Sequence, residues 1–212
     1  MNDLKGVIAA TAATAVLATG VVATVAAPAS GTPSGQRSAA AASHVALVFV
    51  KNAKDPSNST LQLWNGRTHI ATYRAGSGLG TAADYDKKKG DYTPKGKSYR
   101  NDCTTNAGWL PNGRYKPTSF EIGRNSKIKG YAIGLPDTKC RTGKVKRTAL
   151  FIHSEMTKGR KQGPRNGADS PQRWEGVQDY KSNGCIKLHP THIAKLFSYM
   201  NKHGRAVLLT VR

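Results

Sequence analysis

A single cysteine behind a glycine, Cys185, is the residue best suited to chemistry in this chain of 212 residues. It lies in the stretch Lys181–His189, K-S-N-G-C-I-K-L-H, and apolar residues begin directly after it. A thiol becomes a strong nucleophile when a neighbouring imidazole takes its proton. His153, at the end of the apolar run Thr148–Ile152, is the candidate base. These residues predict a thiolate–imidazole pair that carries out acyl transfer.

The neighbours of this pair suggest how it would be assisted. Gly184 lets the backbone turn tightly, so the peptide N–H groups of Asn183, Gly184 and Cys185 can converge as an oxyanion hole. The carbonyl of Ser154 is the simplest partner to fix the tautomer of His153. The alternative is an inert buried cysteine and an ordinary strand-end histidine, since neither residue alone is diagnostic.

A zinc site is a competing interpretation of the same stretch. Cys185, His189 and His192 are all zinc-ligand residue types. The set lacks a second cysteine and crosses the start of a predicted helix. The sequence therefore favours a site without a metal, and it predicts no cofactor.

The N-terminus predicts export. Lys5 precedes an uncharged run, Gly6–Ala27, which ends in the A-x-A-like segment Ala27–Ser30. Residues 1–29 are therefore predicted to be a cleaved secretory signal. An uncleaved membrane anchor is the alternative, although Ala and Thr drive insertion less than Leu. Residues 30–43, rich in Ala, Ser, Gly and Pro, are expected to form a flexible lead to one domain over 44–212.

The cysteine count fits a compartment outside the cytoplasm. Of three cysteines, two are expected to pair in an oxidising environment and one to remain free. The chemistry assigned to Cys185 requires that it be the free one. Cys103 and Cys140 are therefore predicted to form a disulfide.

Hydrophobic patterning predicts a mainly β, β-sandwich-like domain with one C-terminal helix. A hairpin is expected at Asn65-Gly66. The helix begins at Pro190 behind a His189 cap and ends at Gly204. The predicted strands include Val45–Val50, Leu61–Trp64, His69–Tyr73, Ser119–Ile122, Gly130–Leu135, Thr148–Ile152 and Ala206–Val211.

The charge is strongly basic, with 33 Lys and Arg against 12 Asp and Glu and a formal net charge of +21. Such a charge attracts polyanions. The chain contains no helix-turn-helix, zinc-finger or RNA-recognition signature, so nucleic acid is not the expected partner. Anionic cell-wall polymers or an acidic peptide are expected instead, and we expect a monomer.

The stretch S-N-G-C-I-K-L, after a strand that ends I-H-S, resembles the active-site signature of the L,D-transpeptidase catalytic domain, the YkuD-like family. Thr93–Gly96 resembles the T-P-x-G element of the same family. The resemblance extends over about Val45 to Arg212 and is strongest from Leu150 onward.

The resemblance implies that Cys185 attacks the L-to-D bond of a peptidoglycan stem tetrapeptide and releases D-alanine. The acyl group would then pass to the side-chain amine of a second stem, which gives a 3→3 cross-link. It also implies acylation by carbapenems. In this scheme His153 is the base, the Ser154 carbonyl orients it, and the amides of 183–185 form the oxyanion hole.

Substrate contacts are expected from Ser182, Lys187, Trp174 and Tyr131, with packing as the alternative for the two aromatic residues. Three features depart from the family pattern. The separation 185 − 153 = 32 is roughly twice the usual one, so the loop of residues 155–180 contains an insertion. Asn183 replaces the commoner His or Lys, and Lys187 replaces Arg or Asn. An L,D-carboxypeptidase and a non-catalytic wall-binding module are the alternative functions.

Overall fold

The computed structural model describes residues 44–79, 100–167 and 169–212. The predicted signal or anchor (1–29), the flexible lead (30–43) and the element Thr93–Gly96 lie outside the described residues. Within the part of the chain that the structure describes, no helix combines the length and the apolar character needed to cross a bilayer.

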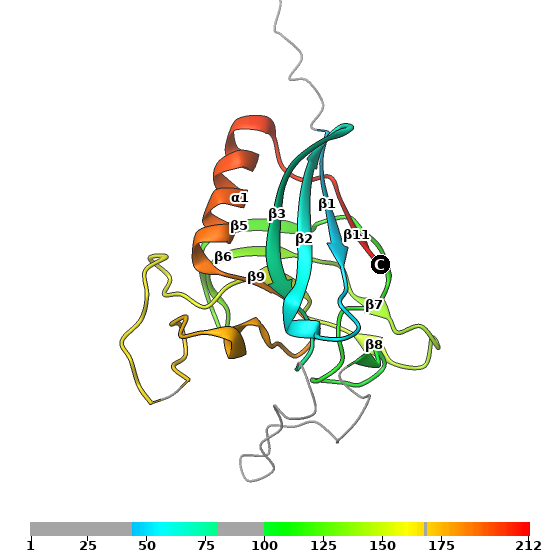
Figure 1. Cartoon of the computed structure of the whole chain (residues 1–212), viewed down its shortest axis with the longest axis horizontal. Coiled ribbons are helices and arrows are strands. Elements are labelled where there is room, and N and C mark those ends of the chain that lie inside the picture. Colours follow the sequence, from blue (N-terminus) through cyan, green and yellow to red (C-terminus); the bar gives the residue numbers. More distant parts are fainter. Residues whose placement is uncertain (1–43, 80–99, 168) are drawn as a thin grey trace, which may run out of the picture. The chain divides into compact units, whose positions relative to one another are not determined.

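A mainly β fold with one C-terminal helix is confirmed (Figure 1). The strands are β1 (Val45–Val50), β2 (Ser59–Asn65), β3 (Thr68–Gly76), β4 (Gly113–Tyr115), β5 (Ser119–Asn125), β6 (Lys129–Gly134), β7 (Thr138–Lys139), β8 (Lys146–Arg147), β9 (Phe151–His153), β10 (Ile186–Leu188) and β11 (Leu208–Val211). The helical elements include α1 (Pro190–His203) and the short 3-10 helices η1 (Pro56–Asn58) and η4 (Val177–Tyr180).

Nine of these strands form one curled sheet in the order β4-β11-β1-β2-β3-β10-β9-β6-β5, and β7 pairs only with β8. In Figure 1, β5 and β6 run across the direction of β1, β2 and β3. The predicted β2–β3 hairpin is present: β2 ends at Asn65, and Gly66 and Arg67 form the two-residue turn, where the φ of +58° at Gly66 suits glycine. The curl encloses an apolar core to which Phe49, Leu63 and Ile133 contribute fully buried side chains.

Helix α1 buries the predicted stripe Ile193, Leu196, Phe197 and Met200. The Nδ1 atom of His189 accepts a hydrogen bond from the backbone N–H of Thr191, so His189 caps the helix as expected. These contacts attach the helix to the sheet through its apolar face.

Two predicted strands begin later than their patterns indicate. The run Thr148–Ile152 becomes extended only at Phe151, because Ala149 adopts a positive φ of 54°. The last strand starts at Leu208 instead of Ala206. β9 ends at His153, one residue beyond the predicted run.

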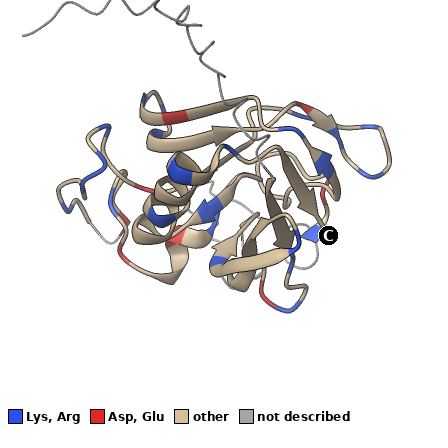
Figure 2. Ribbon diagram, turned by 90° about the horizontal axis from the view of Figure 1, so that it is seen from above, with Lys and Arg blue, Asp and Glu red and all other residues tan. Residues whose placement is uncertain are grey.

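Lys and Arg residues, blue in Figure 2, are spread over strands, loops and the helix. This distribution agrees with a general attraction to polyanions.

Candidate active site

The parallel pairing of β9 and β10 brings the cysteine turn beside the histidine strand. Ile186 lies opposite Ile152, and Lys187 lies opposite His153. Both isoleucines are fully buried in the core. Because side chains alternate along a strand, Cys185, Lys187 and His153 face the other side of the sheet together.

A cavity of about 570 Å³ lies on that side. Its lining includes Cys185, His153, Ser182, Asn183 and Lys187. The nucleophile and base proposed from the sequence therefore share one cavity, although 32 residues separate them in the chain. Such a concave site with two reactive groups can hold a peptide carbonyl next to the thiol.

The Cys185 thiol is the free cysteine, and it donates a weak hydrogen bond to the carbonyl of Ala149 at 3.6 Å. Burial raises the pKa of the Cys185 thiol, while the Phe151 backbone and the charges of Lys187 and Arg147 partly offset this increase. The thiol is therefore protonated at neutral pH in the resting protein.

The Nδ1 atom of His153 lies 3.1 Å from the carbonyl oxygen of Ser154, the partner expected from the sequence. Burial, together with the nearby charge of Lys187, lowers the pKa of His153 to about 3. In the neutral imidazole, an Nδ1–H that donates to this carbonyl leaves Nε2 as a proton acceptor. Both pKa shifts favour the neutral forms, a thiol and an imidazole, over a preformed ion pair.

Ser182 organises the turn that presents Cys185. Its hydroxyl donates to the carbonyl of Cys185 at 2.6 Å and accepts from the N–H groups of Gly184 at 3.2 Å and Gly78 at 3.3 Å. These contacts give Ser182 a structural role, whereas the sequence suggested a substrate contact. They also engage the Gly184 amide, which leaves the amides of Asn183 and Cys185 as candidate oxyanion donors.

Arg147 is a residue of this region that sequence reasoning missed. Its buried guanidinium donates to four carbonyl oxygens, those of Gly108 at 3.0 Å, Trp109 at 3.2 Å, Asn183 at 3.3 Å and Asp102. The planar guanidinium thus joins the cysteine turn to the loop of residues 100–112. No sequence signal separates Arg147 from its exposed neighbour Lys146, since both are basic residues of one short strand.

The predicted disulfide between Cys103 and Cys140 is present. It links the same loop of residues 100–112 to the β7–β8 hairpin, which carries Arg147. The disulfide and Arg147 therefore act on the same junction.

Gly184, in the cysteine turn, has a backbone conformation that favours glycine. Its φ is +119°, and a Cβ atom added there would lie 2.1 Å from Nη2 of Arg147. The close approach of Arg147 to the turn thus depends on the absence of a side chain at residue 184.

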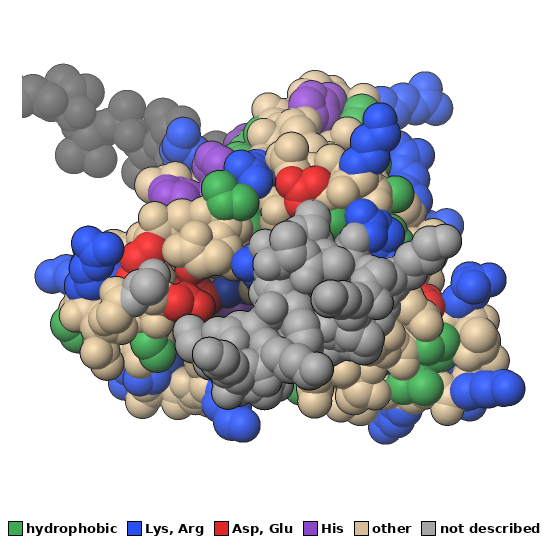
Figure 3. Space-filling view, turned by 60° about the horizontal axis from the view of Figure 1, so that its bottom comes forward, with side chains coloured by type: hydrophobic (Ala, Val, Ile, Leu, Met, Phe, Trp, Pro, Cys, Tyr) green, Lys and Arg blue, Asp and Glu red, His purple; other side chains and the backbone are tan. Residues whose placement is uncertain are grey.

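Lys187 lines the cavity, and its ammonium forms an ion pair with Glu155. Burial raises the pKa of Glu155, and Lys187 partly offsets this increase. On the left of Figure 3, acidic side chains gather beside a hollow in a surface otherwise rich in Lys and Arg. Lys187 therefore connects the cysteine cavity to an acidic part of the inserted loop.

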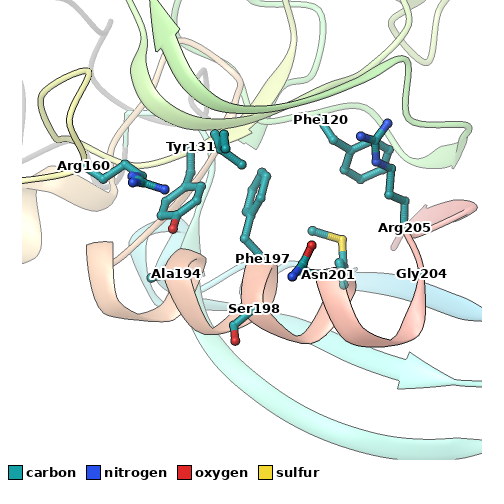
Figure 4. Close-up of a pocket in the computed structure, with 11 residues that line it drawn as sticks. Phe120, Tyr131, Arg160, Ala194, Phe197, Ser198, Asn201, Gly204 and Arg205 are labelled. Atoms are coloured by element: carbon teal, nitrogen blue, oxygen red, sulfur yellow. The ribbon is translucent and has the colours of Figure 1, made fainter.

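Tyr131 does not line the cavity of Cys185 and His153, so a contact with substrate stays a prediction and the packing alternative describes its place in the fold. Tyr131 stacks on Phe197 with ring centroids 4.5 Å apart, in a groove between β5, β6 and α1 (Figure 4). Its neighbour Ala132 is the residue in register with His153. Because side chains alternate along β6, Tyr131 points to the opposite face from His153.

Trp174 also packs instead of lining the cavity. Its ring meets Tyr180 edge-on at 4.7 Å and His189 at 5.2 Å. These contacts attach the inserted loop to η4 and to the start of α1. Trp174 therefore packs in the fold, the alternative to a substrate contact that the sequence left open.

The zinc alternative finds no support among the described residues. Cys185 faces the cavity with His153, whereas His189 caps α1 and stacks edge-on against His192. The one group of potential metal ligands in the described ranges consists of Glu155, Asp169, Glu175 and Asp179.

Residues 52–208 match the model of a known family, YkuD, described as the L,D-transpeptidase catalytic domain. The match covers more than half of the 212 residues. No curated protein matches the sequence significantly.

Three solved structures are similar to this chain. L,D-transpeptidase 1 of Mycobacterium tuberculosis shares 15% identity, with a TM-score of 0.36, over 79% of this chain and 62% of its own. Bd1075 of Bdellovibrio bacteriovorus shares 11%, with a TM-score of 0.42, over 80% and 48%. An L,D-transpeptidase of Mycobacterium smegmatis shares 13%, with a TM-score of 0.38, over 80% and 59%. This chain spans less than two thirds of each, and the family assignment depends on the family model alone.

Proposed function

The chain belongs to the L,D-transpeptidase catalytic domain family, and on this premise we propose that it is a cysteine-dependent L,D-transpeptidase. The family acts on peptidoglycan stem peptides. The proposed reaction forms cross-links between such stems through a thioester acyl-enzyme. The observation that carries the proposal is the shared cavity of Cys185 and His153, which face the same side of adjacent parallel strands.

In the first half-reaction, Sγ of Cys185 attacks the carbonyl carbon of the L-to-D peptide bond as Nε2 of His153 takes the thiol proton. The new C–S bond leaves a negative charge on the carbonyl oxygen, toward which the amides of Asn183 and Cys185 would donate. The C–N bond then breaks, and His153 returns its proton to the departing D-amino acid. The carbonyl of Ser154 keeps the ring in the tautomer that these transfers need.

In the second half-reaction, the amine of another stem attacks the thioester. His153 accepts a proton from that amine, the C–S bond breaks, and Cys185 regains its proton as the new amide forms. A neutral Cys185 thiol and a neutral His153 imidazole suit these two half-reactions. Proton transfer accompanies each attack, so no imidazolium must be desolvated beforehand.

The basic surface and the predicted export signal support action at an anionic cell wall. The net charge of +21 would hold the protein near wall polymers. A Cys103–Cys140 disulfide agrees with an oxidising compartment.

Intact-mass spectrometry with a carbapenem tests the proposal. Wild-type protein is expected to gain one adduct, and Cys185→Ala to gain none. His153→Ala should acylate about 10²–10⁴-fold more slowly, while His69→Ala, a change at an exposed histidine of β3, should acylate at the wild-type rate. A folded wild-type protein that gains no adduct would refute the enzymatic proposal and favour a wall-binding module.

Products from a tetrapeptide donor and an amine acceptor then separate transfer from hydrolysis. A cross-linked product supports the transpeptidase. A free tripeptide as the sole product, with acceptor present, would assign the same acyl-enzyme to an L,D-carboxypeptidase.

A further inference from the structure

The inserted loop holds four carboxylates in one place. Glu155, Asp169, Glu175 and Asp179 each offer an oxygen atom, and these oxygens all lie within 4.8 Å of one another. They are four of the chain's 12 acidic residues, gathered in a protein of net charge +21. Repulsion among four carboxylates at such separations opposes folding unless a cation is present.

Two of these carboxylates are buried and incompletely paired. The Glu175 side chain is 9% exposed, and neither of its oxygens has a hydrogen-bond partner. Its nearest described cation is Arg173, whose Nε lies 3.8 Å from Oε1. Asp179 is 1% exposed; its Oδ2 accepts from the backbone N–H of Gly176 at 2.7 Å and from that of Glu175, but its Oδ1 has no partner. Unpaired buried carboxylate oxygens are costly.

Within the described ranges, two cations pair with this group: Lys187 with Glu155, and Arg173, at 3.8 Å, with one oxygen of Glu175. In that part of the chain, two positive charges therefore face four carboxylates. Both oxygens of Glu175 and Oδ1 of Asp179 have no hydrogen-bond partner, and each of these two residues brings one carboxylate oxygen to the cluster.

We infer that the four carboxylates bind one Ca²⁺. Calcium takes oxygen ligands at 2.3–2.6 Å, so ligands on opposite sides of the ion lie about 4.6–5.2 Å apart. The 4.8 Å spread of the cluster fits this range. Magnesium, at 2.0–2.1 Å, requires about 4.2 Å and a stricter octahedron. Zinc prefers nitrogen and sulfur ligands, which the cluster does not offer.

Bound calcium would join three separate parts of the inserted loop. Glu155 lies at its start, Asp169 in its middle, and Glu175 and Asp179 at its end beside η4. Because Glu155 also holds Lys187, the ion would be linked to the cavity that contains Cys185 and His153. The site depends on these contacts alone and holds whether or not the protein is a transpeptidase.

Terbium luminescence and calcium titration of the full chain test the inference. Trp174 adjoins Glu175 in the sequence and can sensitise Tb³⁺ bound at the cluster. Wild-type protein is expected to show saturable Tb³⁺ emission that Ca²⁺ displaces, and its Tm should rise on addition of Ca²⁺. Glu175→Gln should weaken Ca²⁺ binding by at least about tenfold. Asp137→Asn, which removes an acid paired with Lys146, is the matched control and should bind as wild type does.

Two results would overturn the inference. In the first, Ca²⁺ changes neither the emission nor the Tm of wild-type protein, and Glu175→Gln raises the Tm in EDTA because it only relieves repulsion. In the second, Mg²⁺ displaces Tb³⁺ as effectively as Ca²⁺. Retained binding in Glu175→Gln, together with loss in Asp137→Asn, would place the ion elsewhere and equally refute this site.

Discussion

The cysteine turn and the acidic cluster of the inserted loop lie on either side of Lys187 and are stabilised in opposite ways. In the turn, polar groups find partners within the chain: the Ser182 hydroxyl makes three hydrogen bonds and Arg147 donates to four carbonyls. In the cluster, both oxygens of Glu175 and Oδ1 of Asp179 lack such partners. A nucleophile needs a rigid backbone before substrate arrives. A cation site needs oxygens that the chain itself leaves unpaired.

If contacts within the chain are what stabilise the cysteine turn, replacing Arg147 should have the largest effect on stability. Arg147→Met leaves two buried and two partly buried carbonyls without their donor, so we expect a loss of about 4 kcal/mol in the free energy of unfolding. Urea denaturation measures this loss, and carbapenem acylation of the remaining folded protein should also slow. Arg147→Lys keeps the charge but not the planar guanidinium, so its free energy of unfolding should lie between those of the wild type and Arg147→Met.

Arg114→Met is the control, because Arg114 is exposed on β4 and its loss should cost about 0.5 kcal/mol or less. Equal effects of Arg147→Met and Arg114→Met would show that the turn does not depend on the guanidinium.

Gly184 comes next in expected effect. Gly184→Ala puts a Cβ atom at φ +119° and against Nη2 of Arg147, which should cost about 3 kcal/mol. Gly66→Ala has a positive φ of +58° with open space around the Cβ, so only about 1 kcal/mol is expected. The difference between their denaturation midpoints isolates the contact with Arg147. If Gly184→Ala were as stable as Gly66→Ala, the Arg147 side chain would have to move away from the added Cβ atom at little energetic cost.

Ser182→Ala should have a smaller effect, about 2 kcal/mol, because it removes one hydroxyl and leaves the amides of Gly78 and Gly184 without an acceptor. Acylation should slow as well, since the Cys185 carbonyl loses its donor. Ser198→Ala, on the exposed side of α1, should leave both stability and acylation unchanged. If Ser182 served only to contact substrate, acylation would fall with no change in stability.

The smallest expected effect is on how the alkylation rate of the Cys185 thiol depends on pH. Burial raises the pKa of Cys185, so iodoacetamide should alkylate it slowly at neutral pH, with a midpoint above that of the same cysteine in the urea-unfolded chain. The folded state holds the thiol proton more tightly. Its stability therefore includes a contribution that is present below the unfolded-state pKa and is lost as the pH rises through the folded-state pKa. A plateau in alkylation at neutral pH would instead indicate a preformed thiolate.

The chain sequence predicted the main elements of the fold well where local patterns are strong. The β2–β3 hairpin at Asn65-Gly66, the helix from Pro190 and its four-residue stripe were all confirmed, since turn chemistry and amphipathic spacing are local properties. The Cys103–Cys140 pairing was also confirmed; it followed from an odd cysteine count together with the chemistry that requires Cys185 to be free. The sequence left open whether Tyr131 lines the cavity or packs, because the face to which a strand residue points depends on how that strand pairs.

By itself, the sequence determined which residues have the chemistry: a thiol behind a glycine, an imidazole at a strand end, and a family signature around both. Tertiary structure alone decided what surrounds them. The register of β9 with β10, the reach of Arg147 to Asn183, and the gathering of four carboxylates from one long loop all arise from contacts between residues distant in the chain. Such contacts depend on packing and on desolvation of the groups that meet, and no local pattern encodes either.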